Sequence, residues 1–237
     1  MKPFAPTPPP SDRATVSRAS ERGHYDRETV YAIIDSAWLC HVAFADVQPN
    51  THEPYPLSLP TACWRVGDKV YIHGSNGSRM MKRLARGIPV CLSVTLLDGL
   101  VLARSAFSHS MNFRSVVVFG HFEVVSDSDK SAILDAFMDH IVPGRRLEAR
   151  PGDANELKAT TVLSLPLHEA SAKIRAWGPH DKEEDQALQV WAGVLPVREQ
   201  RMAPVPDEQT IAQGMPLPDT LARWLSTQPD AHAMVKA

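Results

Sequence analysis

The chain has 237 residues, of which 43% are hydrophobic, and a formal net charge of -2 at pH 7. This length supports one large domain or two small ones with a hydrophobic core. The near-zero charge excludes a strong overall attraction to nucleic acid or anionic lipid, and no apolar run is long enough to span a bilayer. The N-terminus lacks the apolar segment of a secretory signal. Cys40, Cys63 and Cys91 lie far apart in apolar runs, which indicates neither a disulfide framework nor a zinc site. We therefore expect a cytoplasmic protein.

The first predicted helix follows a polar N-terminal segment. Residues 1–24 are rich in proline, serine and charged side chains and have almost no apolar periodicity, so we expect a flexible N-terminal arm. Asp26 can cap a helix, in which five apolar residues form one continuous stripe: Val30, Ile33, Ile34, Ala37 and Trp38. Such a stripe is typical of a helix that packs on a core.

Short strands in hairpin order make up most of the remaining chain. Alternating or continuously apolar runs predict strands at 39–45, 57–66 (broken at Pro60), 69–73, 90–97, 100–106, 116–125, 160–167 and 188–197. Asp98-Gly99 predicts a tight hairpin turn between two of them. Helices are predicted at 79–86 and after a cap at Asp127 or Ser128.

This order of elements predicts a mainly β (α+β) protein, an antiparallel barrel with peripheral helices. Strict alternation of strands and helices is absent, which argues against a doubly wound parallel sheet. We expect one barrel domain at 25–200, preceded by the arm and followed by a proline-rich C-terminal tail at 201–237. Within this tail, Leu221, Trp224 and Leu225 could form one short anchoring turn.

A strand, a small-residue turn and a basic helix start follow one another at residues 70–84. Ser78 can cap the helix, and Arg79, Lys82 and Arg83 crowd its beginning. Cations are unfavourable there, because the free N–H groups of a helix N-terminus are partly positive. A bound phosphate would remove the conflict, so the segment is a candidate phosphate site. The alternative is a solvated basic face on a short helix.

Three further places hold candidate chemistry. Asn112, Arg114 and Ser115 precede the predicted strand 116–125, where Arg114 could be a second anion clamp or belong to an ordinary polar turn. His73 could bond a ligand, transfer a proton or be structural. Trp191 could cover a flat ligand or belong to the core or an interface. The spacing of the ten histidines supports no metal site.

Seven segments of the chain, taken in order, also resemble one known family. They are 25–29, 70–75 with 78–80, 95–107, 109–120, 156–160, 169–173 and 191–196. The series resembles the pyridoxamine 5'-phosphate oxidase-related proteins of the FMN-binding split-barrel type, in particular the flavin-nucleotide-binding branch that is similar to nitroimidazole-resistance proteins.

The resemblance implies a split β-barrel that forms a homodimer, with FMN at the subunit interface. It implies phosphate ligands at Ser78, Arg79 and Lys82; the oxidase has Ser-Arg-Lys in a row, whereas Met80 interrupts the series here. Other flavin contacts would come from Pro60, Thr61, His73, Gly74, Asn112, Arg114 and Ser115, with Trp191 as a further candidate. His73 is the candidate catalytic residue, because related resistance proteins carry a histidine near the flavin at this place.

From this resemblance we expect an FMN-dependent oxidoreductase acting on a small molecule. The oxidase's C-terminal substrate-binding pattern, Arg-Leu-His-Asp-Arg, is not evident after Trp191, so we do not expect oxidation of pyridoxamine phosphate. Three alternatives remain open: a haem-binding split-barrel protein with His73 or His109 as axial ligand, a flavin-binding or sensing module without turnover, and use of the deazaflavin F420 in place of FMN.

Overall fold

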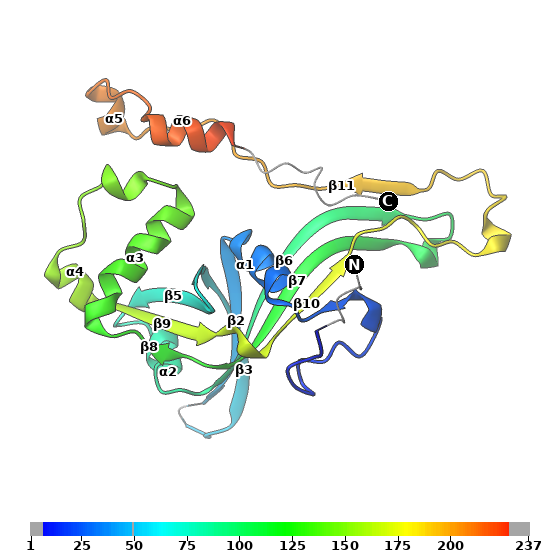
Figure 1. The fold of residues 1–237 in the computed structure, drawn as a ribbon, viewed down its shortest axis with the longest axis horizontal. Coiled ribbons are helices and arrows are strands. Elements are labelled where there is room, and N and C mark those ends of the chain that lie inside the picture. Colours follow the sequence, from blue (N-terminus) through cyan, green and yellow to red (C-terminus); the bar gives the residue numbers. More distant parts are fainter. Residues whose placement is uncertain (1–6, 49, 228–237) are drawn as a thin grey trace, which may run out of the picture.

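The computed structural model describes residues 7–48 and 50–227 and contains two antiparallel sheets (Figure 1). The larger sheet has the order β1 (Gly23–His24), β10 (Ala170–Arg175), β7 (Ser110–His121), β6 (Pro89–Leu102), β2 (Leu39–Val47) and β3 (Pro54–Ala62), and β11 (Gly193–Pro196) pairs with β6. The smaller sheet has the order β4 (Trp64–Val66), β5 (Lys69–Ser75), β9 (Thr160–Pro166) and β8 (Glu123–Val124). The prediction of a mainly antiparallel β protein with a few helices is confirmed.

The main core lies between the two sheets and helix α1 (Arg27–Asp35). Asp26 caps α1 as predicted, because its Oδ1 accepts a hydrogen bond of 2.8 Å from the Thr29 N–H. Ile33 and Ile34 of α1 are fully buried against apolar residues of both sheets, among them Val42, Leu92, Ile72, Val116 and Leu163. Each such side chain contributes about 1.5–3 kcal/mol relative to exposure, so this helix holds the sheets together.

The predicted hairpin at Asp98-Gly99 is wrong. β6 runs without interruption through both residues, and the register with β7 shifts by one residue between Leu97 and Gly99, as in a β-bulge. Glycine is required here because a side chain at residue 99 would lie 2.9 Å from Val194 Cγ1 of the neighbouring β11. The true turn between β6 and β7 contains the short helix Ala106–Ser108. Together, β6, β7 and β11 form an arm that extends away from the core (Figure 1).

Several strand limits also differ from the prediction. Pro60 lies within β3, and the chain bends at Cys63 instead, between β3 and β4. Pro60 is tolerated because β3 is an edge strand of its sheet, where a missing N–H is not needed for pairing. β7 begins at Ser110, six residues earlier than the predicted start at 116, and β10 was not predicted. β11 is shorter than the predicted strand 188–197 and leaves Trp191 outside it.

The remaining helices lie at the edges of the sheets. They are α2 (Arg79–Leu84), α3 (Asp127–Ile141), α4 (Ala154–Ala159), α5 (Glu208–Ala212) and α6 (Asp219–Ser226). The cap of α3 is Ser126, one residue before the predicted cap candidates. α3 covers a second apolar cluster on the smaller sheet, where the Trp64 Nε1–H donates to the Ile133 carbonyl over 3.1 Å. Within the described residues, no helix combines the length and apolar character needed to cross a membrane.

The predicted anchoring turn of the C-terminal segment lies within helix α6. The Trp224 ring of α6 packs edge-on against Trp38 at 6.2 Å, and the guanidinium of Arg201 stacks over Trp224 at 3.9 Å. Thr220 Oγ1 also donates to Glu148, which follows the short helix Arg145–Leu147 after α3. Residues 228–237 of the predicted tail lie outside the described residues.

The described part of the N-terminal segment, residues 7–24, lies against the larger sheet. Arg13 and Ser11 both bind the Glu169 carboxylate, Ala14 is buried, and β1 pairs with β10. The prediction of a flexible arm did not anticipate these contacts, because they are mainly polar and leave no apolar periodicity in the sequence. Residues 1–6 lie outside the description, and the domain limits at 25 and 200 stay a prediction.

Replacing Glu169 with Gln is expected to loosen the N-terminal segment. The bonds from Arg13 and Ser11 lower the pKa of Glu169 to about 2. Because this pKa is depressed in the folded protein, the stabilisation is present above the ordinary value of 4.5 and is lost as the pH falls towards 2. At neutral pH, Glu169→Gln should therefore speed trypsin cleavage at Arg18, and the exposed control Glu199→Gln should not. Equal cleavage rates would contradict the anchoring role.

Candidate functional site

The strand–turn–helix segment predicted from residues 70–84 is present. β5 ends at Ser75, and the Ser78 hydroxyl accepts a hydrogen bond from the Met81 N–H at 3.4 Å, which caps α2. Gly74 permits a close approach of strand and helix, since a Cβ at this position would lie 2.9 Å from Met81 Cγ. The turn and helix start are therefore held firmly on the end of β5.

A buried carboxylate faces the basic residues of α2. Asp46 of β2 is 2% exposed and forms ion pairs with Arg79 at 2.7 Å and with Arg83 at 2.9 Å. The Val47 N–H bond and the two guanidinium groups hold the pKa of Asp46 below its ordinary value. Part of the charge conflict seen in the sequence is thus resolved by a residue from a distant strand. Lys82, the third cation of this segment, has no recorded contact with Asp46 among the described residues, so this carboxylate pairs with two of the three cations.

The three cations differ in their accessibility. The Arg79 side chain is 62% exposed and also donates to the Tyr55 hydroxyl at 2.7 Å, whereas the Arg83 side chain is 23% exposed. Lys82 is exposed, and among residues 7–48 and 50–227 no ion pair is recorded for it. Arg79 and Lys82 are therefore the α2 cations that a phosphate could reach without a large rearrangement.

Asn112, Arg114 and Ser115 lie within β7, so the prediction that they form a polar segment before the strand is wrong. Arg114 donates two bonds to the Asp98 carboxylate, at 2.9 and 2.7 Å, which satisfies its guanidinium inside the chain. The side-chain amide oxygen of Asn112 accepts a bond from the buried Arg175. Ser115 Oγ donates to the Lys173 carbonyl of β10 at 3.4 Å. Because side chains alternate along a strand, Ser115 lies on the face of β7 opposite to Asn112 and Arg114.

His73 lies under α3, in the second apolar cluster. Its ring is 5.6 Å from Trp64 and 4.6 Å from Phe137, measured between centroids. Burial lowers its pKa from the ordinary value of 6.5, so the imidazole is neutral at pH 7. Its Nδ1 is buried and has no hydrogen-bond partner in the described part of the chain. No hydrogen bond or ion pair in that part joins His73 to Arg79 or Lys82.

The other candidate residues lie on separate parts of the molecule. Pro60 and Thr61 belong to the edge strand β3, opposite His41 and Cys40 of β2. Trp191 is 63% exposed and lies just before β11, with its ring over Gly193. A single chain therefore does not gather all of the predicted cofactor contacts into one pocket.

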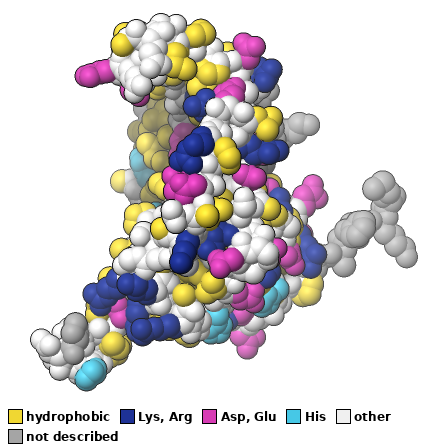
Figure 2. Space-filling model, turned by 90° about the vertical axis from the view of Figure 1, so that its left-hand side faces the viewer, with side chains coloured by type: hydrophobic (Ala, Val, Ile, Leu, Met, Phe, Trp, Pro, Cys, Tyr) yellow, Lys and Arg dark blue, Asp and Glu magenta, His cyan; other side chains and the backbone are white. Residues whose placement is uncertain are grey.

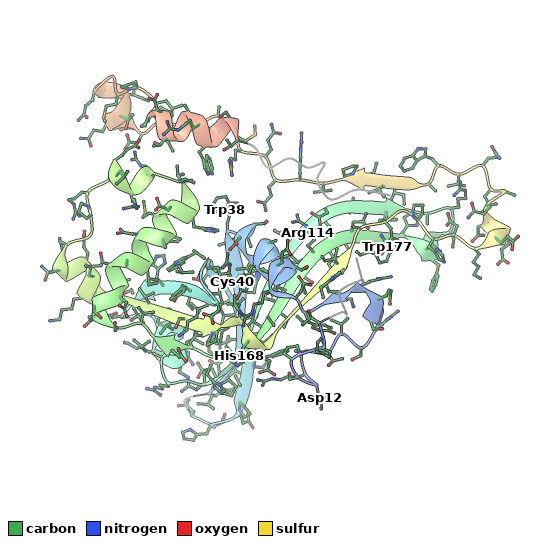
Figure 3. The ribbon with its side chains drawn as sticks, in the orientation of Figure 1. Asp12, Trp38, Cys40, Arg114, His168 and Trp177 are labelled. Atoms are coloured by element: carbon green, nitrogen blue, oxygen red, sulfur yellow. The ribbon has the colours of Figure 1, made fainter. Side chains whose placement is uncertain are left out.

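The arm carries a group of exposed apolar side chains. They come from β6, β7, β11 and the adjoining loops: Leu97, Leu100, Phe107, Met111, Trp191 and Leu195. Figure 3 shows Trp177 just beyond the end of β10, on the same arm, with Arg114 nearer the core. On the face that carries α3 and α4, acidic and basic side chains are instead interspersed (Figure 2). Exposed apolar groups of this kind are typical of an interaction surface.

No group of three or more histidine, cysteine, aspartate or glutamate side chains suited to hold a metal ion occurs among the described residues.

The sequence did not single out Arg22 and Arg175 as candidate site residues. Both belong to a cavity on the arm, and no motif distinguishes them; only the fold brings them together.

A comparison with curated proteins gave no significant match. The family model described as pyridoxamine 5'-phosphate oxidase matches residues 26–174.

The chain is similar to the flavocytochrome Anf3 from Azotobacter vinelandii, with 42% identity and a TM-score of 0.82 over 91% of this chain and 97% of that one. It is also similar to an FAD and haem binding protein from Mycobacterium smegmatis, with 39% identity and a TM-score of 0.78 over 85% and 96% of the two chains. A proposed 5-nitroimidazole antibiotic resistance protein from Bacteroides thetaiotaomicron shares the fold, at 22% identity and a TM-score of 0.52 over 64% and 86%. The family model matches residues 26–174, and the sheets and helices agree with those of the related structures. The chain therefore belongs to the pyridoxamine 5'-phosphate oxidase family and has the fold of the FMN-binding split barrels.

Proposed function

We propose that this chain is a redox protein that binds a flavin nucleotide between two copies of itself and carries a haem as a second cofactor. The observation that carries the proposal is the similarity, along nearly the whole of both chains, to a flavocytochrome and to an FAD and haem binding protein. The family resemblance implies FMN, whereas the second relative is described as binding FAD. The proposal therefore covers both flavins, and it joins the haem alternative to the leading hypothesis.

The arrangement of the candidate residues supports a site shared between two subunits. Among the described residues, no recorded hydrogen bond or ion pair joins the candidates Pro60 and Thr61 of β3, the cations of α2 and Trp191 before β11 to one another, and the arm presents apolar side chains to solvent. A homodimer that buries this arm would cover those side chains and could bring candidate residues of the two chains together. The dimer is part of the proposal, as the resemblance to the family implied.

Arg79 and Lys82 are the proposed ligands of the flavin phosphate. Asp46 offsets only part of the positive charge on α2, so a phosphate would meet a positively charged surface there. Asp46 and Tyr55 also hold the Arg79 guanidinium in position before any ligand arrives. This positioning reduces the loss of side-chain freedom on binding.

His73 is the residue that we propose would bind the haem iron. Iron takes a neutral imidazole nitrogen, and burial keeps the His73 ring neutral. The surrounding Trp64 and Phe137 rings provide the apolar walls that such a cofactor needs, and the unbonded Nδ1 lacks a partner. His109 is the second candidate. Its Nδ1 lies 3.1 Å from the Ser105 carbonyl, which fixes the ring and leaves Nε2 available.

When bound, the flavin and the haem would supply the electron-transfer chemistry. The residues of this chain would position the two cofactors: the α2 cations would hold the phosphate end, and the apolar residues under α3 would exclude water from the haem. Oxidoreductase activity on a small molecule is the alternative role, in which His73 lies near the flavin, as the family resemblance implies, and does not bind haem. The F420 alternative is tested by the identity of the extracted cofactor.

The protein as purified is expected to show both flavin absorption bands and a Soret band. Extraction and mass spectrometry would then identify the flavin as FMN or FAD, and any deazaflavin would be seen in the same measurement. Flavin without haem would reduce the proposal to the flavoprotein of the sequence analysis. A spectrum with neither chromophore, unchanged after incubation with both, would contradict it.

Arg79→Ala is expected to weaken flavin binding tenfold or more, because a charge-assisted contact contributes about 1.5–3 kcal/mol. Affinity would be measured by fluorescence titration of the flavin-stripped protein. Arg86→Ala is the matched control, since Arg86 is exposed and follows the same helix. Unchanged affinity in the Arg79 variant would remove Arg79 from the proposed phosphate site.

His73→Ala is expected to abolish the Soret band while the flavin bands remain. The flavin signal reports that the variant still folds, so loss of haem alone points to the axial ligand. The parallel variant His109→Ala should keep its haem. The opposite pattern would assign the ligand to His109, and retention of haem in both variants would exclude both histidines.

A further inference from the structure

A cavity of about 380 Å³ lies on the arm, away from α2 and from His73. Three separate segments line it: Arg22 of the N-terminal segment, residues 107–110 before and at the start of β7, and Arg175, Trp177 and His180 at and after the end of β10. This volume lies in the range of small-molecule sites. Of the residues that the structure describes, no acidic side chain lines the cavity, whereas two arginines and two histidines do.

Arg175 is the buried cation of this cavity. It is 4% exposed, and its guanidinium donates to the Asn112 side chain, to the Trp177 carbonyl at 2.8 Å and to the Gly178 carbonyl at 3.2 Å. All of these acceptors are neutral. Burial and the nearby charge of Arg22 lower the pKa of Arg175. The chain thus maintains a desolvated positive charge here at a cost in free energy, with no carboxylate recorded beside it among the described residues.

Arg22 adds a second cation beside the first. Its guanidinium stacks over the Trp177 ring at 4.9 Å, while that of Arg175 lies 5.2 Å from the same ring. The Arg22 Nε is buried without a hydrogen-bond partner in the described chain, and its ion pair with the exposed Glu21 is long, at 3.3 Å. Two like charges are held together around one indole ring, an arrangement that an oxyanion would stabilise.

Aromatic side chains supply the other half of the site. Trp177 is partly exposed, and Phe107 at the rim is 95% exposed. Planar groups such as nucleobases stack on aromatic rings and on guanidinium planes. We propose that this cavity binds a nucleotide, with its phosphate on Arg22 and Arg175 and its base against Trp177 and Phe107. The nucleotide is either a separate ligand or the adenylate end of a flavin dinucleotide.

The inference explains the anchoring of the N-terminal segment. Glu169 holds Arg13 and Ser11, and the same segment continues through β1, which pairs with β10. These contacts place Arg22 over the end of β10, where Arg175 lies. The N-terminal segment, which its composition predicts to be flexible, therefore supplies one of the two cations of the cavity.

Calorimetric titration of the flavin-stripped protein with ADP, and with adenosine as the uncharged probe, tests the inference. We expect ADP to bind at least tenfold more tightly than adenosine, and Arg22→Gln to remove this preference without changing adenosine binding. Arg22 is chosen because Arg175 is bonded to the buried Asn112 and its replacement could disturb folding. Trp177→Leu should weaken both probes, and the exposed Arg27→Gln is the matched control.

Two loaded forms distinguish the sources of the nucleotide. If the adenylate end of FAD occupies the cavity, ADP should bind the FMN-loaded protein but not the FAD-loaded one, and Arg22→Gln should weaken FAD more than FMN. If the ligand is separate, ADP should bind both forms equally. Three results would each overturn the inference. The first is that ADP binds no more tightly than adenosine, and the second is that Arg22→Gln keeps the preference for ADP. The third is that Arg22→Gln loses haem while its ADP binding is unchanged. The ADP titration needs no bound flavin, so its outcome is independent of the proposed function.

Discussion

The pairing of β6 with β7 is the interaction on which the rest of the structure depends. At one end the two strands carry the fully buried Leu92 and Val116 into the core beneath α1, and at the other they extend as the arm. The bulge between Leu97 and Gly99 lets β6 continue from the core into the arm without a break. Gly99 has no side chain, so β11 can pack closely beside it. A tight hairpin at this point would have removed the arm, and with it the exposed apolar surface proposed here as a subunit interface.

Charge pairing within the chain decides which cations remain available to a ligand. Arg114, which the sequence marks as an anion clamp, is satisfied by Asp98, and Asp46 offsets part of the charge on α2. Arg175 receives only neutral acceptors, although no motif marks it. A desolvated guanidinium without a carboxylate beside it is a more specific indication of an anion site than a run of basic residues, because most exposed basic residues are simply solvated.

The two faces of the smaller sheet have different roles. Val70 and Ile72 of β5 point into the main core, whereas Tyr71 and His73 lie under α3. The alternation of the strand therefore places the imidazole in an aromatic cluster, apart from the basic helix that follows it by only a few residues. In the proposed flavocytochrome, this separation would let one short segment contribute to two cofactor sites.

Local periodicity, capping residues and ordered motifs were enough to predict the fold class, the helix that begins after Asp26, the turn and helix around Ser78 and the family. Only the tertiary structure decided the course of β6 through Asp98-Gly99, the place of Asn112 and Arg114 within a strand, and the partners of Arg79, Arg114 and Arg175. Turn propensity is a local quantity, and neighbouring strands such as β11 can override it. Ion pairs and shared cavities join residues far apart in the chain, such as Asp46 with Arg79 and Arg22 with Arg175. Local sequence patterns therefore cannot predict them.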